Sequence, residues 1–228
     1  MDIVFPVSCL HCGKRGLLLC PECLSLCPAA ERESAKWIFP LLDYRHPPVK
    51  KALWLLKYKG KKGVAKIFAE LLYGQILEEL SELSLLENFR EPLLMPIPLS
   101  RKRRNERGYN QAELICKEIV KIHLSPSPSP WQGEGGQGPG EVWTLETNIL
   151  IKPKETEHQA RIKDRGIRLK NIIGSFAVKN SRENTNRIKD RNIILIDDIT
   201  TTGATLNEAR KILKAAGARK IIAFTVAH

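Results

Sequence analysis

Short apolar runs alternate along the chain with segments in which apolar residues recur at helical spacing. A run of β-branched and other apolar residues at 193–196 is followed by two aspartates, and residues 219–226 read as the next parallel strand. Between them, apolar side chains at three- and four-residue intervals over residues 206–213 predict a helix, with Gly217 as its C-terminal signal. Strands that alternate with amphipathic helices are typical of an α/β fold with a doubly wound, mostly parallel sheet.

The same patterns predict the elements that precede this unit. Apolar residues recur every three or four positions from about residue 62 to 83, so we expect a long helix there. The apolar run at 93–98 ends in two prolines, and we expect a strand because proline suits a strand end better than a central ladder. We expect a basic loop at 101–107, then a helix that places Cys116 on its buried face, and a strand at about 148–151.

Residues 124–141 differ in composition from the rest of the chain. The segment is rich in serine, proline and glycine and carries few charged or apolar side chains. It cannot bury enough apolar surface to offset the entropy of ordering, so we expect a disordered insertion. The chain is therefore expected to consist of a cysteine-rich module at 1–28 and an α/β domain at 29–228 that contains this insertion.

Composition and charge limit the classes of function. The chain has 228 residues, 43% of them hydrophobic, which is ordinary for a folded α/β domain with a small appendage. A net charge of +12 favours polyanionic partners, namely a phosphorylated metabolite, a nucleotide or nucleic acid. The first residues lack the basic stretch of a secretory signal, and no apolar run approaches the roughly 18 residues of a membrane span. We expect a cytoplasmic protein without membrane insertion.

The segment that is most informative about function joins the strand at 193–196 to the following helix. The loop at 201–205 carries hydroxyl side chains and a glycine, and its amides together with the helix dipole can hold a phosphate monoester. Ionised carboxylates only accept hydrogen bonds, so the two aspartates suit the hydroxyls of a ribose. A solvated turn with an N-cap threonine is the alternative, but the combination of strand, acids, loop and helix favours a ligand site. The candidate binding residues are Asp197, Asp198, Thr201, Thr202, Gly203, Ala204 and Thr205.

Two C-x-x-C pairs near the N-terminus supply four thiolates separated by a seven-residue spacer. Clustered cysteines in a reducing compartment indicate metal ligation more readily than disulfides, and four thiolates suit tetrahedral zinc. Four ligands leave no open position for catalysis, so the zinc is expected to be structural. Two redox-active pairs are the alternative, and Cys27 or His11 could replace one ligand. The predicted ligands are Cys9, Cys12, Cys20 and Cys23.

The acid pair and the loop that follows it closely resemble the 5-phosphoribosyl-1-pyrophosphate (PRPP) binding motif of type I phosphoribosyltransferases. With the N-terminal cysteines, further segments narrow the resemblance to the ComF family, and the resemblance covers nearly the whole chain except the insertion. These segments are Leu56-Lys57-Tyr58-Lys59-Gly60, Pro96-Ile97-Pro98 followed by Arg107-Gly108-Tyr109-Asn110-Gln111-Ala112, and Gln159 followed by Arg168-x-x-Asn171-x-x-Gly174-Ser175-Phe176.

The resemblance implies a type I phosphoribosyltransferase-like fold in which the adjacent acids contact the ribose hydroxyls and the loop holds the 5-phosphate. It also implies Mg²⁺ bound together with PRPP, a pyrophosphate loop near residues 98–101 and a mobile loop over the site. A compact pyrophosphate requires several charge-assisted donors, and basic residues just past a strand end can supply them. The candidate contacts are Arg101, Arg107 and Gln159.

Two functions from different classes follow. The first is an enzyme that transfers the phosphoribosyl group of PRPP to a nitrogen acceptor with release of pyrophosphate. The second, implied by the ComF resemblance, is a non-catalytic competence-type protein that supports DNA uptake and transformation through single-stranded DNA or competence proteins. Aromatic residues make up only 6% of the chain, which weakens the case for base-stacking platforms. No acceptor-recognition element is evident in the sequence.

Overall fold

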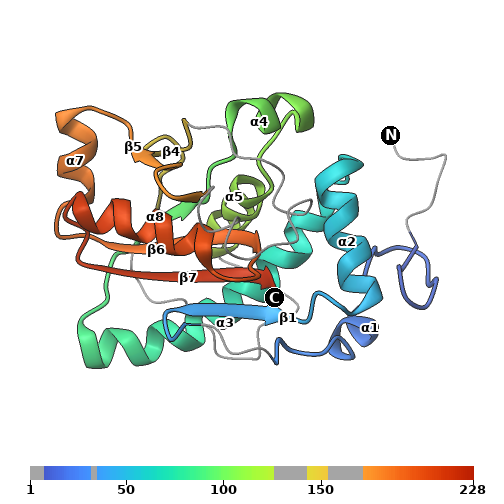
Figure 1. The fold of residues 1–228 in the computed structure, drawn as a ribbon. Coiled ribbons are helices and arrows are strands. Elements are labelled where there is room, and N and C mark those ends of the chain that lie inside the picture. Colours follow the sequence, from blue (N-terminus) through green and yellow to red (C-terminus); the bar gives the residue numbers. More distant parts are fainter. Residues whose placement is uncertain (1–7, 32–34, 126–142, 154–171) are drawn as a thin grey trace.

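The computed structural model describes residues 8–31, 35–125, 143–153 and 172–228. Its centre is a sheet in which every neighbouring pair of strands is parallel (Figure 1). In the described residues the order of the strands is β1-β7-β6-β2-β3. The strands are β1 (Ile38–Leu42), β7 (Lys220–Ala227), β6 (Asn192–Ile199), β2 (Leu93–Pro96) and β3 (Thr144–Leu145).

The strand β6 is central because both of its faces are covered. Ile194 and Ile196 pack into one core cluster, whereas Ile193 and Leu195 pack into another. Successive side chains of a strand point to opposite faces, so a strand that is buried on both sides reads as a continuous apolar run. This explains why the sequence showed the strand clearly without alternation.

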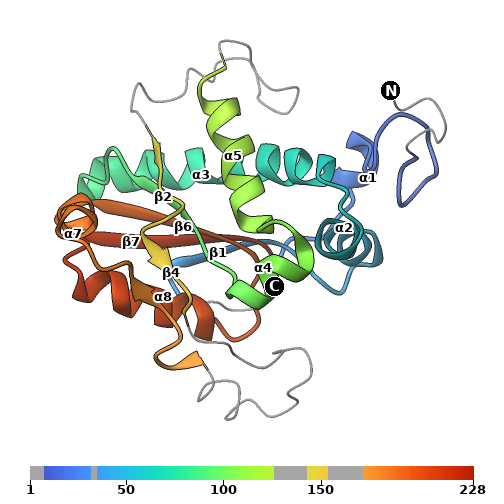
Figure 2. The ribbon, with the colours of Figure 1, turned by 90° about the horizontal axis from the view of Figure 1, so that it is seen from above.

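Helices cover the two faces of the sheet, as Figure 2 shows with the sheet seen along its edge. One face is covered by α3 and α5, with α2 beside them, and the other by α8 (Figure 2). The fold is therefore doubly wound, which confirms the predicted fold class. The helices are α1 (Pro21–Ser25), α2 (Pro47–Tyr58), α3 (Gly63–Glu87), α4 (Arg101–Arg107), α5 (Gln111–His123), α7 (Arg182–Ile188) and α8 (Ala204–Ala215).

Several local predictions are confirmed. The helix expected over residues 62–83 is α3, which continues to Glu87 and ends where Asn88 takes a left-handed conformation with φ 50°. The strand expected at 93–98 is β2. Cys116 is fully buried on α5, and burial raises its pKa well above the usual value. This thiol is part of the core and is not a reactive group.

The basic segment at 101–107 is a helix, α4, so the prediction of a loop was wrong. Ser100 acts as the N-cap, since its side chain accepts a hydrogen bond from the amide of Arg103 at 3.5 Å. Gly108 ends the helix in the left-handed region with φ 75°. The capping serine and the terminal glycine were visible in the sequence, but the charged run between them showed no apolar periodicity.

The strand expected at about 148–151 is present, but it does not belong to the parallel sheet. It forms β4 (Leu150–Ile151), which pairs antiparallel with β5 (Ala177–Val178) in a separate two-stranded sheet. Leu150 and Phe176 pack into the same cluster as the buried face of α8. This small sheet therefore covers α8 and adds nothing to the parallel sheet.

The cysteine-rich segment is attached to the domain through apolar side chains. Leu19 and Leu24 belong to the same core cluster as Val49 and Leu53 of α2. The predicted insertion lies outside the described residues from residue 126 onward. Within the described ranges, no helix has both the length and the hydrophobicity needed to cross a bilayer.

Candidate functional site

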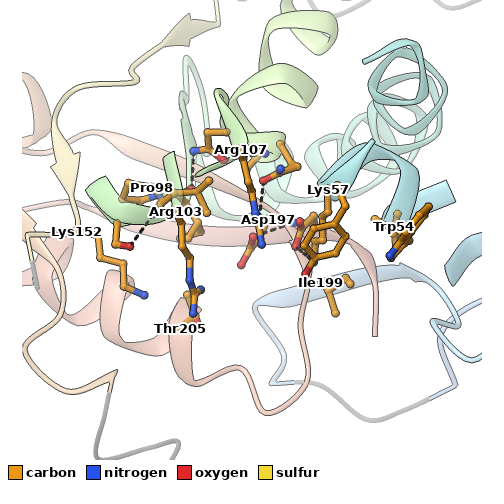
Figure 3. Close-up of a pocket in the computed structure, with 18 of the residues that line it drawn as sticks. Trp54, Lys57, Pro98, Arg103, Arg107, Lys152, Asp197, Ile199 and Thr205 are labelled. Atoms are coloured by element: carbon orange, nitrogen blue, oxygen red, sulfur yellow. Dashed lines mark hydrogen bonds and ion pairs between the residues drawn. The ribbon is translucent and has the colours of Figure 1, made fainter. Parts of the chain in front are cut away.

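A cavity of about 330 Å³ lies where β2 and β6 end (Figure 3). Parallel strands direct their carboxyl ends to one edge of a sheet, and open α/β sheets bind ligands at that edge. The walls come from α2, the segment after β2, α4, α5 and the end of β6. The lining includes Trp54, Lys57, Tyr58, Arg103, Arg107, Gln111, Lys152, Asp197, Asp198 and Thr205.

The two predicted acids, Asp197 and Asp198, both border this cavity but meet different partners. They are consecutive residues of a strand, so their side chains leave it on opposite faces. Asp198 forms an ion pair with Lys57, whose Nζ lies 3.0 Å from its carboxylate oxygen. Asp197 accepts a hydrogen bond from the amide of Asp198 at 2.8 Å and also borders a smaller hollow over the loop at 201–205.

Burial and the neighbouring charge of Asp198 raise the pKa of Asp197 to about 7. Lys57 and Lys152 act against this shift, because a nearby cation favours the charged carboxylate. Asp197 is therefore divided between its protonated and ionised forms near neutral pH. A hydroxyl group or a cation that approaches it favours the ionised form.

The loop at 201–205 has the geometry of an anion-binding turn. In the described residues, the amides of Thr201, Thr202 and Gly203 donate to no protein group, while the amide of Ala204 lies 3.4 Å from Thr202 Oγ1. Gly203 has φ 70°, and a Cβ there would lie 3.1 Å from Ile38 Cδ1, so only glycine fits without strain. The helix α8 begins at the next residue and adds its positive dipole end.

Cationic side chains surround the rest of the cavity, and Figure 3 shows them on more than one side of Asp197. Lys57, Arg103, Arg107 and Lys152 all line it. Arg107 donates to Gln111 Oε1 at 2.9 Å, which fixes the guanidinium against α5.

Of the three predicted pyrophosphate contacts, the structure places one at the cavity. Arg107 lines the cavity, whereas Arg101 is exposed and does not. Gln159 lies outside the described residues. Sequence reasoning did not single out Arg103 or Lys152, and for these two no local pattern distinguished them from other basic residues.

Two further residues of the site, Lys57 and Asn110, could have been found from the sequence, because they lie in segments that resemble the ComF family. Lys57 lies in one of the segments that resemble the ComF family. Asn110 lies in another: its Nδ2 donates to Ile97 O at 2.9 Å, and its Oδ1 accepts from the amide of Ala112 at 3.1 Å. Asn110 therefore ties the segment after β2 to the start of α5.

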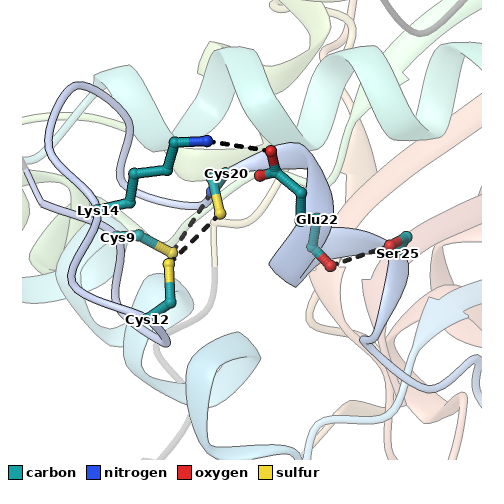
Figure 4. A network of polar contacts seen from close by, with 6 residues as sticks. All are labelled: Cys9, Cys12, Lys14, Cys20, Glu22 and Ser25. Atoms are coloured by element: carbon teal, nitrogen blue, oxygen red, sulfur yellow. Dashed lines mark hydrogen bonds and ion pairs between the residues drawn. The ribbon is translucent and has the colours of Figure 1, made fainter.

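The four predicted zinc ligands converge at one point in the N-terminal segment. Figure 4 shows three of them, Cys9, Cys12 and Cys20. All their sulfur atoms lie within 4.8 Å of one another, and the Sγ atoms of Cys12 and Cys20 are 3.6 Å apart. A zinc ion with Zn–S bonds of about 2.3 Å holds its sulfurs about 3.8 Å apart in a tetrahedron, so this cluster fits a metal ion such as zinc. The amide of Cys20 also donates to Cys9 Sγ at 3.5 Å.

The alternatives left open by the spacing are less well placed. Cys27 Sγ donates to the carbonyl of Cys23 at 3.4 Å and lies outside the sulfur cluster. His11 is exposed, with its ring near that of His46. Because the two C-x-x-C pairs share one cluster, the arrangement also disfavours two independent redox pairs.

We expect about one zinc ion per chain in protein prepared without chelator. Cys12→Ser should lose most of the metal, because it removes one of four thiolate ligands. Cys27→Ser is the matched control and should keep it. Elemental analysis of the three proteins is the measurement. A wild-type content below about 0.2 zinc per chain, or equal losses in both variants, would contradict the assignment.

Asp197→Asn should stabilise the protein more at pH 8 than at pH 5. The pKa of Asp197 is about 7 in the folded chain and about 4 when unfolded, so the folded state binds the extra proton between these values. The free energy of unfolding therefore falls as pH rises through this window. Asparagine keeps the Oδ1 acceptor but does not titrate.

The measurement for this change is the melting temperature of both proteins from pH 5 to pH 8. The difference between them should widen as pH rises. Asp190→Asn makes the same chemical change at an exposed position and is the matched control. A constant difference for Asp197→Asn would show that this carboxyl does not titrate as described.

Comparison with known proteins agrees with the fold. Residues 152–228 match the family described as "Phosphoribosyl transferase domain". The chain is 27% identical to competence protein F of Haemophilus influenzae, over 93% of this chain and 81% of that protein. It is 23% identical to the DNA utilization protein YhgH of Escherichia coli, over 93% of this chain and 80% of that protein.

A shorter match extends over part of another competence protein. The chain is 35% identical to competence protein ComFC of Bacillus subtilis over 59% of this chain and 43% of that protein. A solved hypoxanthine phosphoribosyltransferase of Staphylococcus aureus superposes with a TM-score of 0.37 at 11% identity, over 72% of this chain and 63% of that one. The domain match and these relatives support a ComF-family protein of the type I phosphoribosyltransferase-like class.

Proposed function

We propose that the cavity binds PRPP together with Mg²⁺ and that the protein transfers the phosphoribosyl group to a nitrogen acceptor. The observation that carries this proposal is that an acid pair and several cationic side chains border one cavity, and that the adjoining hollow is formed by a loop whose amides at 201–203 have no partner among the described residues. Each chemical part of PRPP then has a matching protein group: phosphate, ribose hydroxyls and pyrophosphate.

The 5-phosphate is proposed to bind the loop at 201–205. The unpaired amides of Thr201, Thr202 and Gly203 offer donors, and the start of α8 contributes a positive potential. The neighbouring hollow is bordered by Asp197, which places the ribose next to the acids. Asp197 and Asp198 would then accept hydrogen bonds from the two ribose hydroxyls.

Binding of the ribose requires a change at Asp198, because Lys57 holds its carboxylate in the structure described here. A ribose hydroxyl at that carboxylate would compete with the lysine. Lys57 would then be free to pair with a phosphate oxygen of the ligand. Such an exchange of one ion pair for another keeps both charges compensated within a partly enclosed site.

The pyrophosphate is proposed to lie among Lys57, Arg103 and Arg107. Charge-assisted hydrogen bonds from lysine and arginine to phosphate oxygens are among the stronger polar contacts in proteins. Mg²⁺ prefers oxygen ligands from few carboxylates plus substrate phosphates, and the acid pair fits that preference. When bound, it would neutralise charge on the departing pyrophosphate.

In the proposed reaction the bond between C1 and the pyrophosphate oxygen breaks, and the acceptor nitrogen forms a bond to C1. The pyrophosphate leaves with the electron pair, and the nitrogen loses a proton to solvent. This chemistry depends mainly on positioned charges that stabilise a cationic ribose and an anionic leaving group. The residues described above supply both kinds of charge.

A second candidate function is that of a non-catalytic protein in DNA uptake or use. The observation in its favour is the naming of two relatives as competence protein F and DNA utilization protein YhgH. A net charge of +12 is compatible with contacts to single-stranded DNA, and a competence protein could also be the partner. In this case PRPP would act as a bound signal.

We expect the protein to bind PRPP in the presence of Mg²⁺ and Asp198→Asn to weaken this binding about tenfold to a hundredfold, because it removes a charged acceptor. Thr202→Val should weaken PRPP binding only about fivefold. It removes one hydroxyl donor, but it also frees the amide of Ala204 from the Thr202 hydroxyl, so that this amide can donate to the phosphate. Calorimetric titration is the measurement. Asp190→Asn makes the same chemical change at an exposed position and should leave the affinity unaltered.

Titration with ligand fragments separates the two ends of the site. Ribose 5-phosphate should respond to both substitutions, whereas inorganic pyrophosphate should respond to neither strongly. Arg103→Ala should weaken pyrophosphate binding more than Arg101→Ala, because only Arg103 lines the cavity. Absence of PRPP binding at millimolar ligand would show that this is no phosphoribosyl site.

Catalysis itself is tested by release of pyrophosphate. With PRPP, Mg²⁺ and a set of amines and nucleobases, the wild-type protein should release pyrophosphate faster than a protein-free control. Asp198→Asn should reduce that rate. If PRPP binds but no acceptor promotes release, the enzyme hypothesis is wrong and the second candidate function is favoured.

A further inference from the structure

Two aromatic side chains on α2 are exposed although they line the cavity. Trp54 is 46% exposed and Tyr58 is 53% exposed. The neighbouring Leu53 and Leu56 are 1% and 0% exposed, so the helix buries its apolar face elsewhere. Two neighbouring aromatic rings that are open to a cavity offer a ligand an apolar surface.

The two rings form a continuous surface. They lie one helical turn apart, with centroids 6.3 Å apart and planes tilted by 47°. A further ring therefore cannot enter between them, but it can stack on an outer face. Lys59 Nζ lies 5.3 Å from the Trp54 ring and Arg107 Cζ lies 5.3 Å from the Tyr58 ring. These contacts help to hold both rings in place.

A hydrogen-bond donor without a protein partner lies beside the aromatic pair. Arg107, over the Tyr58 ring, donates to Gln111 Oε1 at 2.9 Å. Gln111 lines the same cavity, is 1% exposed, and its Nε2 donates to no group within the described part of the chain. Buried amide donors are nearly always paired, so this one indicates a missing acceptor atom.

The position of the pair matches the geometry of a ribose 5-phosphate. Figure 3 shows Trp54 at the opposite side of the cavity from Thr205 and Lys152, with Asp197 and Lys57 between them. In ribose 5-phosphate, the phosphate on C5 and the substituent on C1 lie at opposite ends of the sugar. A phosphate on the loop and hydroxyls at the acids would direct C1 toward α2.

We propose that Trp54 and Tyr58 form a stacking subsite for a planar nitrogen heterocycle, with Gln111 Nε2 as a donor to it. This inference rests on the proposed function and narrows the acceptor to an aromatic ring nitrogen, excluding ammonia and alkyl amines. The ring nitrogen bonds to C1 as the C1–O bond breaks, the electron pair leaves with pyrophosphate, and the nitrogen proton passes to water. Stacking orients the ring without reading its full identity.

The experiment compares ribose 5-phosphate with AMP and UMP, which carry the same phosphate and sugar plus a base. Wild-type protein should bind AMP and UMP about tenfold more tightly than ribose 5-phosphate, as expected for one stacked base. Trp54→Ala should remove most of this preference and leave the affinity for ribose 5-phosphate unchanged. Trp54→Phe should restore most of it, because a ring remains.

A matched control and an added variant define the subsite further. Trp37 packs against Arg210 and does not line the cavity, so Trp37→Ala should keep the preference. Gln111→Leu should reduce the preference while the aromatic pair stays intact. Unchanged affinity for ribose 5-phosphate in each variant shows that the protein is folded.

The outcomes separate this inference from the proposed function. If ribose 5-phosphate and PRPP bind but AMP and UMP bind no more tightly, the stacking subsite is wrong and the phosphoribosyl site stands. If neither ribose 5-phosphate nor PRPP binds, the proposed function fails first. If Trp54→Ala weakens binding of a single-stranded oligothymidine while AMP shows no preference, the pair is a DNA-stacking surface and the proposal is overturned.

Discussion

The ion pair between Lys57 and Asp198 joins the two sides of the cavity, and the arrangement of the site depends on it. Asp198 lies next to the last residue of the central strand β6, and Lys57 lies near the end of α2. A carboxylate at so enclosed a position needs a charged partner, because burial of an unpaired charge is costly. The pair therefore holds α2 over the carboxyl end of the sheet, and with it the exposed rings of Trp54 and Tyr58.

The neighbouring acid, Asp197, lies in an environment that disfavours its charged form. Asp197 is partly buried beside a second carboxylate, and its pKa rises to about 7 as a result. An asparagine would be more favourable for the folded state at neutral pH, so stability alone does not explain the residue. Strain of this kind is typical of binding sites, where a ligand supplies the missing partners. The amides of Thr201, Thr202 and Gly203 and the Nε2 of Gln111, which have no partner among the described residues, are further examples.

The N-terminal module supports the same side of the cavity. Leu19 and Leu24 pack into the core cluster that contains Val49 and Leu53 of α2. A metal ion bound by the four cysteines would stabilise this segment, since metal binding is coupled to folding. The module thus contributes to the position of α2 without lining the cavity in the described residues.

The sequence by itself determined the features that depend on neighbours in the chain. These are the buried strand before the acids, the glycine turn into α8, the long helix α3 and the spacing of the four cysteines. It failed at the segment 101–107, where a charged run without apolar periodicity is helical because of its caps. The tertiary structure alone decided which cations face the acids, because Lys57, Arg103 and Lys152 come from distant elements. Asp197 and Asp198 are also neighbours in the sequence, but the structure extends β6 through both of them. Successive side chains of a strand point to opposite faces, so the two carboxylates meet different partners.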